Sequence, residues 1–110
     1  MDFDVNVGNR DGICVVKILG DVDIFTSSRL DECLRRQVDD GNTEITVDLE
    51  DCSYMDSEGM KILIRTRRSI GEDGQVVICG ASGVVARAFE LLGLDQLFEF
   101  IPSVSDIDST

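Results

Sequence analysis

One serine stands between two carboxylates in Asp56-Ser57-Glu58, and its hydroxyl could serve as a plain helix N-cap or as a phosphorylation switch. Ser57 falls at a predicted helix start, where backbone N–H groups lack partners and a hydroxyl can stay exposed. A phosphate on Ser57 could be held by the helix N-terminus and would add a charge of about −1.5 to −2. A partner surface shaped for the hydroxyl would then meet steric conflict and unmatched charge. The competing interpretation, a plain N-cap, is compatible with this role because a capping serine can still be a kinase substrate.

A second acidic turn, Gly20-Asp21-Val22-Asp23, also follows a predicted strand. Aspartates in such turns often hydrogen-bond to their own backbone, so turn and cap chemistry is one interpretation of Asp21 and Asp23. The other is contact with a partner protein beside Ser57, and the residue types leave both open. Thr26 adds a hydroxyl at the start of the next predicted helix.

Catalytic and metal chemistry find little support in the residue types. The chain has no histidine, which excludes Ser-His-Asp and Cys-His catalysis. Asp23 and Asp56 could in principle form a carboxylate pair for acid–base catalysis, but no other feature supplies a substrate pocket. The four cysteines form no Cys-x-x-Cys pair, so we predict buried reduced thiols rather than a zinc site. They are Cys14, Cys33, Cys52 and Cys79. We therefore predict a protein that is not an enzyme and that has neither a metal site nor a cofactor.

The composition favours a protein partner over nucleic acid or a membrane. The 110 residues fit one domain spanning 1–110, and 43% hydrophobic residues can supply one core. Asp and Glu outnumber Lys and Arg by 22 to 10, for a formal net charge of −12. Such a chain would repel nucleic acid and anionic membranes, and a basic protein surface suits it better. The N-terminus lacks the basic start and apolar run of a signal peptide, and no apolar stretch approaches the roughly 20 residues that span a bilayer. This predicts a cytoplasmic protein without direct membrane contact.

Strand and helix signals alternate along the chain, with no linker or repeat. Alternating apolar residues at 3–7 predict a half-exposed strand, and the turn residues at 9–12 predict a hairpin. Residues 13–19 are nearly all apolar, which predicts a central strand covered on both faces. Further strands are predicted at 45–49, 76–79 and 97–101. Helices are predicted after the cap candidates at 26–28, from 57 to about 70, and after Ser82. The helix after Ser82 is expected to bury Val85, Ala88, Phe89 and Leu92, and the tail from 103 to 110 to form one weak helical turn.

These elements predict an α/β domain whose sheet is mixed and mostly parallel, with an N-terminal antiparallel hairpin strand and helices packed on it. In such folds, the loops beyond the carboxyl ends of the parallel strands carry function. Two of those loops are 20–26 and 52–59. The acidic turn and Ser57 are therefore predicted to lie at the same edge of the sheet.

The segment Tyr54-Met55-Asp56-Ser57-Glu58-Gly59-Met60-Lys61-Ile62-Leu63 resembles the signature of STAS domains, which occur in anti-sigma factor antagonists and sulfate transporters. Ile45–Leu49 resembles the strand that leads into the signature, Gly20–Asp23 the family's acidic turn, and Leu91–Leu94 the end of its third helix. The resemblance covers essentially the whole chain in order. It implies the STAS fold and a bacterial signalling protein that acts by binding partners.

In antagonists of this family, the serine after the aspartate is phosphorylated by the partner anti-sigma factor, which is a serine kinase. Carried over, that residue is Ser57. The resemblance implies that the unphosphorylated protein binds the kinase, so that a sigma factor is released to transcription. It also implies that phosphorylation ends this binding and that a serine phosphatase resets the switch. With the acidic turn included, the predicted partner-binding residues are Asp21, Asp23, Thr26, Asp56, Glu58 and Gly59.

Glu58 departs from the family pattern, because many antagonists have a second small residue after the switch serine. A carboxylate at the predicted first helical position favours the helix dipole. It also places permanent negative charge beside Ser57, which would weaken kinase recognition or hold the domain partly in an always-modified state. An alternative function that keeps the fold is a STAS scaffold or regulatory subunit of a signalling or transport complex, without a sigma factor role.

Overall fold

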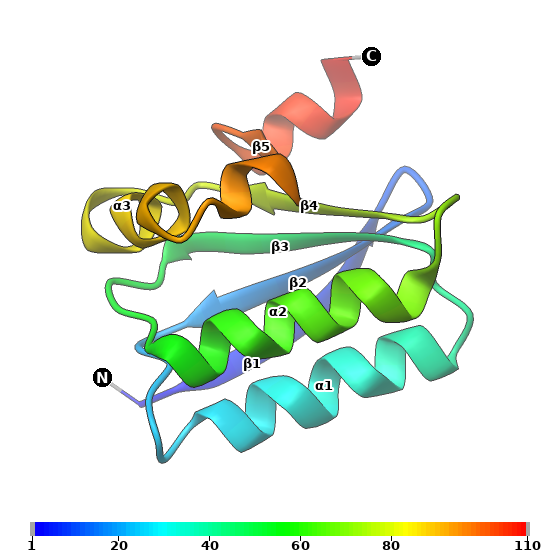
Figure 1. The fold of residues 1–110 in the computed structure, drawn as a ribbon. Helices are drawn as coiled ribbons and strands as arrows, with labels where there is room; N and C mark the ends of the chain where they lie inside the picture. Colours follow the sequence, from blue (N-terminus) through cyan, green and yellow to red (C-terminus); the bar gives the residue numbers. More distant parts are fainter. Residues whose placement is uncertain (1, 110) are drawn as a thin grey trace.

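A five-stranded sheet with the order β1-β2-β3-β4-β5 forms the centre of the computed structural model, which describes residues 2–109 (Figure 1). β1 and β2 pair antiparallel and the later strands pair in parallel, which confirms the predicted mixed, mostly parallel α/β sheet. The strands are β1 (Asp4–Arg10), β2 (Ile13–Leu19), β3 (Glu44–Asp51), β4 (Gln75–Cys79) and β5 (Glu99–Ile101). The α-helices are α1 (Ser27–Asp39), α2 (Ser57–Ile70) and α3 (Gly83–Leu91), and the 3-10 helices are η1 (Leu94–Gln96) and η2 (Val104–Ser109).

The β1–β2 hairpin turns at Asp11 and Gly12, inside the predicted turn. Both residues have positive φ, 52° for Asp11 and 85° for Gly12, and the Asn9 side-chain oxygen accepts a hydrogen bond from the Gly12 N–H at 3.0 Å. A two-residue turn with positive φ matches the twist of paired antiparallel strands. The turn sets the register in which Val7 pairs with Val16.

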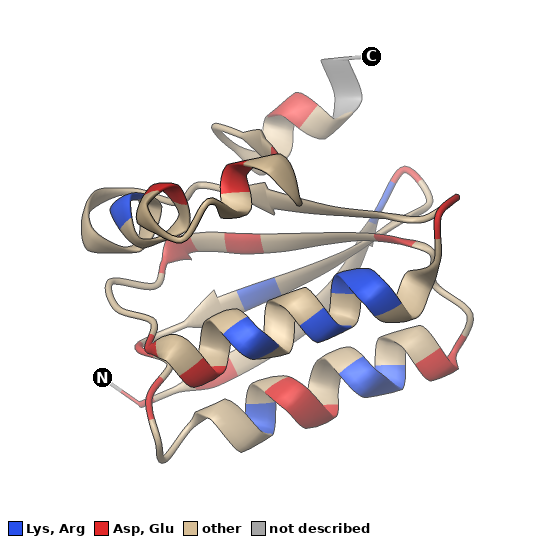
Figure 2. Cartoon of the chain, in the orientation of Figure 1, with Lys and Arg blue, Asp and Glu red and all other residues tan. Residues whose placement is uncertain are grey.

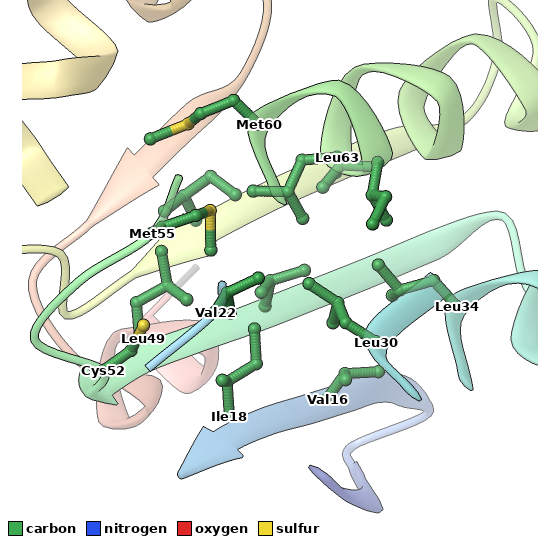
Figure 3. Close-up of a cluster of buried hydrophobic side chains, with 14 of the residues drawn as sticks. Val16, Ile18, Val22, Leu30, Leu34, Leu49, Cys52, Met55, Met60 and Leu63 are labelled. Atoms are coloured by element: carbon green, nitrogen blue, oxygen red, sulfur yellow. The ribbon is translucent and has the colours of Figure 1, made fainter. Parts of the chain in front are cut away.

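The helices share one face of the sheet. Strands β2 to β5 follow each other in sheet order, so right-handed crossovers put α1, α2 and α3 on the same side. Figure 1 shows α1 and α2 running side by side across it. The core lies between these helices and the sheet (Figure 3). Its fully buried side chains include Val16, Ile18, Leu30, Leu34, Val47, Leu49 and Leu63.

The prediction that the strand at 13–19 is covered on both faces is wrong. Val16 and Ile18 of β2 are buried under the helices, but alternate residues such as Lys17 are only half-buried. Within residues 2–109, no α-helix covers their face of the sheet, since α1, α2 and α3 lie on the other. β3 is the strand that is buried on both faces over most of its length, because Thr46 and Asp48 are also inaccessible.

The predicted core residues of the third helix are correct except for Leu92. α3 buries Val85 and Phe89 fully and Ala88 in part, whereas Leu92 is 59% exposed. The helix ends at Leu91, so Leu92 falls outside its packed face. Phe98 is buried instead and packs edge-to-face on Phe89, with ring centroids 5.9 Å apart. The final strand begins at Glu99 rather than at 97, because the chain is still turning out of η1.

All four cysteines are free thiols, as predicted. Cys33 is half-buried and the other three are buried. Burial raises the pKa of each thiol, and that of Cys79 rises to about 12. The thiols therefore stay protonated near neutral pH, which is the unreactive form.

The C-terminal tail forms η2, which confirms the predicted helical turn. Val104 of η2 lines a cavity of about 380 Å³ on the second face of the sheet, together with Lys17 and Asp48. Of the helices within residues 2–109, none has both the length and the apolar character needed to cross a membrane.

Candidate functional site

Two loops meet at the carboxyl-terminal edge of the sheet through backbone hydrogen bonds. The Val22 N–H donates to the Tyr54 carbonyl and the Asp56 N–H donates to the Val22 carbonyl, both at 2.9 Å. They form an isolated parallel bridge between Val22 and Met55, beyond the last β2–β3 pair. The predicted meeting of the acidic turn with the loop before Ser57 is therefore confirmed.

The core anchors this bridge from below. The side chains of Val22 and Met55 are 0% and 5% exposed and point into the hydrophobic cluster (Figure 3). Cys52 is also buried, and its thiol donates to the Tyr54 carbonyl at 3.2 Å. Side chains alternate along an extended chain, so Asp21 and Tyr54 are left on the outer side, where both are exposed.

Asp23 organises the turn that leads into α1. Its Oδ1 accepts hydrogen bonds from the N–H groups of Phe25 at 2.9 Å and Thr26 at 3.1 Å. The Thr26 hydroxyl accepts from the Asp23 N–H at 2.9 Å and donates to the Asp21 carbonyl at 2.7 Å. Thr26 is in the N-cap position of α1, yet its side chain bonds back to the turn instead of capping the helix. Turn chemistry is thus observed for Asp23 and Thr26, whereas the Asp21 carboxylate is exposed.

Helix α2 begins at Ser57, as predicted, but Ser57 is not its N-cap. Asp56 is the N-cap, with φ −81° and ψ −179°, and its Oδ1 accepts a hydrogen bond from the Gly59 N–H at 3.0 Å. Ser57 is the first helical residue and Glu58 the second, one position later than predicted. Asp and Ser cap helices comparably well, so residue type alone could not decide between the two neighbours.

The Ser57 side chain is exposed, and its hydroxyl has no hydrogen-bond partner among residues 2–109. Asp56 and Glu58 flank it in the chain. Glu58 lies 4.0 Å from the Arg65 guanidinium, with both side chains nearly half exposed. An exposed pair at that separation contributes little to stability, so the Glu58 charge remains largely available beside Ser57.

Gly59 lets α2 approach the bridge closely. A Cβ at this position would lie 2.5 Å from Met55 Cγ and 2.8 Å from Val22 Cγ1, closer than real contacts allow. The absence of a side chain thus permits the buried Val22–Met55 pair to pack directly under the first turn of the helix. Gly59 was predicted as a partner-binding residue, and the role that the structure shows for it is the close packing of α2 on Met55 and Val22.

Two residues that the sequence analysis missed stand out at the same edge. Ile24 and Phe25, directly after the acidic turn, are 79% and 85% exposed, and Tyr54 in the facing loop is 46% exposed. Single exposed apolar residues are common, but three bulky ones on two hydrogen-bonded loops are typical of a surface that a protein partner covers. A signal was available in the sequence, because an Ile-Phe pair is unusual in a turn, where small polar residues prevail.

The carboxylates at this edge have local structural roles. The two carboxylates considered for acid–base catalysis are both engaged by backbone N–H groups, Asp23 in its turn and Asp56 at the helix cap. Over the part of the chain that the structure describes, no three Cys, Asp or Glu side chains gather closely enough to hold a metal ion.

The assignment of Asp56 as the N-cap predicts different effects on stability for substitutions of two adjacent residues. Asp56→Ala should lower the free energy of unfolding by about 1 kcal/mol, because the Gly59 N–H loses its acceptor. Ser57→Ala should change it by less than about 0.5 kcal/mol, since its hydroxyl has no hydrogen-bond partner among the described residues. Urea denaturation followed by circular dichroism measures both. A greater cost for Ser57→Ala than for Asp56→Ala would show that the cap has been assigned to the wrong residue.

The packing role of Gly59 predicts that Gly59→Ala destabilises the fold by about 1–3 kcal/mol through overpacking. This loss opposes the gain of up to about 1 kcal/mol that alanine usually brings inside a helix. Gly8→Ala is the matched control, because nothing lies within 4 Å of a Cβ at that strand position. The same denaturation assay applies, and a Gly59→Ala protein as stable as the wild type would refute the close approach.

Comparison with known proteins identifies relatives over nearly the full chain. A model of the STAS domain family matches residues 4–107. An anti-sigma-B factor antagonist of Staphylococcus aureus is 34% identical over 98 residues, which cover 88% of this chain and 91% of the relative. A crystal structure of an anti-sigma factor antagonist from Mycobacterium paratuberculosis has a TM-score of 0.89 at 27% identity, covering 96% of this chain and 90% of the other. The phosphorylated form of the Bacillus cell fate determinant SpoIIAA shares the fold, with a TM-score of 0.73 at 20% identity and 98% coverage of both chains.

The segment 54–63 that carried the sequence resemblance supplies one side of the bridge, the N-cap and the first turns of α2. The match to the family model extends from β1 into η2, far beyond that segment. The chain belongs to the STAS domain family.

Proposed function

We propose that this protein is an anti-sigma factor antagonist, which binds its anti-sigma factor while Ser57 is unmodified and is released when Ser57 is phosphorylated. The observation that carries the proposal is an exposed serine hydroxyl, without a partner in the described chain, on an edge fixed by the Val22–Met55 bridge. The name of the Staphylococcus aureus relative supports the class of partner. Binding of the anti-sigma factor would free a sigma factor for transcription.

The docking edge, defined as Ile24, Phe25, Tyr54 and Ser57, combines apolar anchors with the switch residue. The backbone around Ile24 and Phe25 is held by hydrogen bonds from the Phe25 and Thr26 N–H groups to the Asp23 carboxylate, so little backbone freedom is lost when a partner covers these anchors. The exposed carboxylates of Asp21 and Glu58 lie around them. The complementary surface on the partner is therefore an apolar pocket with a basic rim.

The remaining predicted partner-binding residues act mainly by holding this edge in shape. Asp23 and Thr26 fix the turn, Asp56 caps α2, and Gly59 allows the helix to sit on the bridge. Their substitution would weaken binding indirectly, by displacing Ser57 and the apolar anchors.

Phosphorylation would change the docking edge without refolding it. The γ-phosphoryl group of ATP is transferred to Ser57 Oγ, the hydroxyl proton goes to a base of the kinase, and ADP remains. Because Asp56 occupies the Gly59 N–H, the N–H groups of Ser57 and Glu58 in the first turn are left to stabilise the phosphate. A serine phosphatase would restore the hydroxyl by hydrolysis.

Release follows from the chemistry of the transfer site itself. The kinase must hold nucleotide phosphates next to Ser57, so the phosphoserine product faces those negative charges at close range. It also carries a bulky group of about −1.5 to −2 charge into a pocket sized for a hydroxyl. A basic rim on the partner attracts the docking edge from a distance, but it does not relieve this local conflict.

This chain contributes the phosphoryl acceptor and no catalytic group, and we propose that it is not an enzyme and needs no cofactor of its own. The partner kinase brings ATP and magnesium. Because such kinases use cellular ATP, the proposal places the protein in the cytoplasm.

Glu58 supports a second candidate function. Its carboxylate is nearly half exposed and keeps a permanent negative charge next to Ser57. A STAS scaffold or regulatory subunit of a signalling or transport complex would use the same edge constitutively, without phosphorylation.

Phosphorylation separates the two functions. Incubation with ATP, Mg²⁺ and each anti-sigma-type serine kinase of the source organism should add one phosphate, which peptide mass spectrometry should place on Ser57. Ser57→Ala should still bind the kinase in calorimetry, and Ser57→Asp should bind at least about tenfold more weakly, a loss of about 1.4 kcal/mol. Ser53→Asp makes the same charge change at another exposed serine of this loop and should bind within about twofold of wild type.

A kinase that binds the protein but adds no phosphate, or adds it at another residue, would rule out the switch and leave the scaffold function. Equal losses for Ser53→Asp and Ser57→Asp would show that only the total charge of the loop matters.

The apolar anchors predict a large effect of Phe25→Ala on binding and none on folding. Removing a buried aromatic anchor from an interface costs about 2 kcal/mol, or roughly 30-fold in affinity. The melting temperature should stay unchanged because the ring is 85% exposed in the free protein. Leu91→Ala, on the 73% exposed Leu91 of α3, is the control. Weaker kinase binding by Leu91→Ala alone would move the interface from the docking edge to α3.

A further inference from the structure

Positive charge is concentrated on one side of this acidic protein. Helices α1 and α2 carry seven of the ten Lys and Arg residues but four of the 22 Asp and Glu residues. This helical layer therefore has a net charge of +3 and the rest of the chain −15. Figure 2 shows blue residues along both helices, whereas the charged positions of the loops and strands are mostly red.

Three of the cations form a stripe along α2. Lys61, Arg65 and Arg68 follow each other at spacings of four and three residues, which places them on one side of the helix, and all three are exposed. Arg65 is 3.2 Å from Asp31 of α1. In the described part of the chain, Lys61 and Arg68 form no ion pair. Their charges are available to a ligand.

A groove between α1 and α2 borders this stripe. It has a volume of about 480 Å³, and its charged lining consists of Arg35, Arg65, Arg68, Asp31 and Asp39. The negative charge of Asp31 is already paired, because its carboxylate accepts hydrogen bonds from Arg35 at 2.9 Å and Arg65 at 3.2 Å. Burial alone would raise the pKa of Asp31, but these two bonds outweigh it and the pKa is lowered. The groove thus keeps a positive excess, which Lys61 extends toward the start of α2.

We propose that this groove and the Lys61–Arg65–Arg68 stripe bind an acidic segment of a protein partner. Guanidinium groups pair with carboxylates through directed hydrogen bonds, and Arg68, which has no partner among the described residues, lies at the rim of a groove large enough for several side chains. The composition of this surface differs from that of the docking edge: the surface is basic, whereas the docking edge is apolar and has acidic residues around it. One chain can therefore bind two partners of opposite charge, or two regions of one partner.

Charge also argues against the other polyanions and against self-association. Nucleic acid and anionic membranes extend well past the helical layer and would meet the −15 carried by the rest of the chain. A second copy would bring a net charge of −12 with it. A short acidic segment can stay within about one Debye length, 8–10 Å, of the stripe and feel chiefly its local charge.

The proposal does not depend on Ser57 and is tested without a kinase. The probe is a fluorescein-labelled short peptide of alternating glutamate and glycine, with the glutamine version as its control, and binding is followed by anisotropy. Wild-type protein should bind the glutamate peptide, and added salt should weaken it. Arg68→Glu and Lys61→Glu should each weaken binding about fivefold or more. Arg87→Glu makes the same change in net charge on exposed Arg87 of α3 and should stay within about twofold.

Several results would overturn the proposal. Equal affinity for the glutamate and glutamine peptides would show that carboxylates are not needed for binding. A loss of affinity in Arg87→Glu equal to that in Arg68→Glu would show that only the net charge of the protein matters. Tighter binding of a DNA duplex or of phosphatidylglycerol vesicles, lost in Arg68→Glu, would assign the stripe to a polyanion. Self-association in sedimentation, lost in Arg68→Glu, would assign it to a second copy. Circular dichroism melts confirm that each variant is folded, and unchanged peptide binding by Ser57→Asp keeps this test separate from the switch.

Discussion

Two backbone hydrogen bonds between Val22 and the segment 54–56 are the constraint on which the functional edge depends. The β2–β3 pairing is irregular between Lys17 and Leu19, and the bridge joins the loops that follow these two strands, together with a hydrogen bond from the Gly20 N–H to the Asp51 carbonyl at 3.1 Å. The bridge continues the sheet for one more residue pair and drives Val22 and Met55 into the core. Everything that projects outward, including the Ile24–Phe25 pair and Ser57, is thereby fixed relative to the rest. Hydrogen bonds and buried side chains thus hold a surface that consists of loops and a helix start.

Much of this arrangement could be predicted from the sequence, because it depends on periodicity. Apolar runs and helical spacing placed the strands and helices, and the rule that loops beyond parallel strands share one edge brought the acidic turn to Ser57. The identity of the α2 cap could not be predicted, since Asp56 and Ser57 are both good capping residues and the choice depends on one ψ angle. Leu92 was misassigned because the apolar pattern of α3 runs past the residue where the helix ends. The exposure of Ile24 and Phe25 depends on a turn geometry set by Asp23 and Thr26, which hydrophobicity alone does not report.

Positive and negative charges are separated in this protein, which its total composition does not reveal. A net charge of −12 suggests a uniformly acidic protein, but α1 and α2 together carry +3. The two regions meet at the start of α2, where Glu58 and Arg65 approach to 4.0 Å. Under our two proposals, a basic partner would be attracted to the loop edge and an acidic segment to the helical layer. The boundary between them is set by helix α2 itself, whose first turn is acidic and whose later turns are basic. This order also suits the helix dipole, since Glu58 lies in the first turn and Arg67 and Arg68 in the last.

The local environment of Ser57 determines whether its phosphorylation would change the free energy of folding or the free energy of partner binding. Its hydroxyl makes no hydrogen bond within the described chain, and the N-cap role belongs to Asp56. Esterification therefore removes no intramolecular interaction, and the helix start is stabilised by the same cap before and after. A phosphate on the first helical residue also gains the free N–H groups and the dipole of α2, which offsets the repulsion from Asp56 and Glu58. If Ser57 is phosphorylated as we propose, most of the difference between the two forms would be expressed in the complex with the partner rather than in folding. A serine that served as the cap would not have this property, because its modification would alter the helix and the interface together.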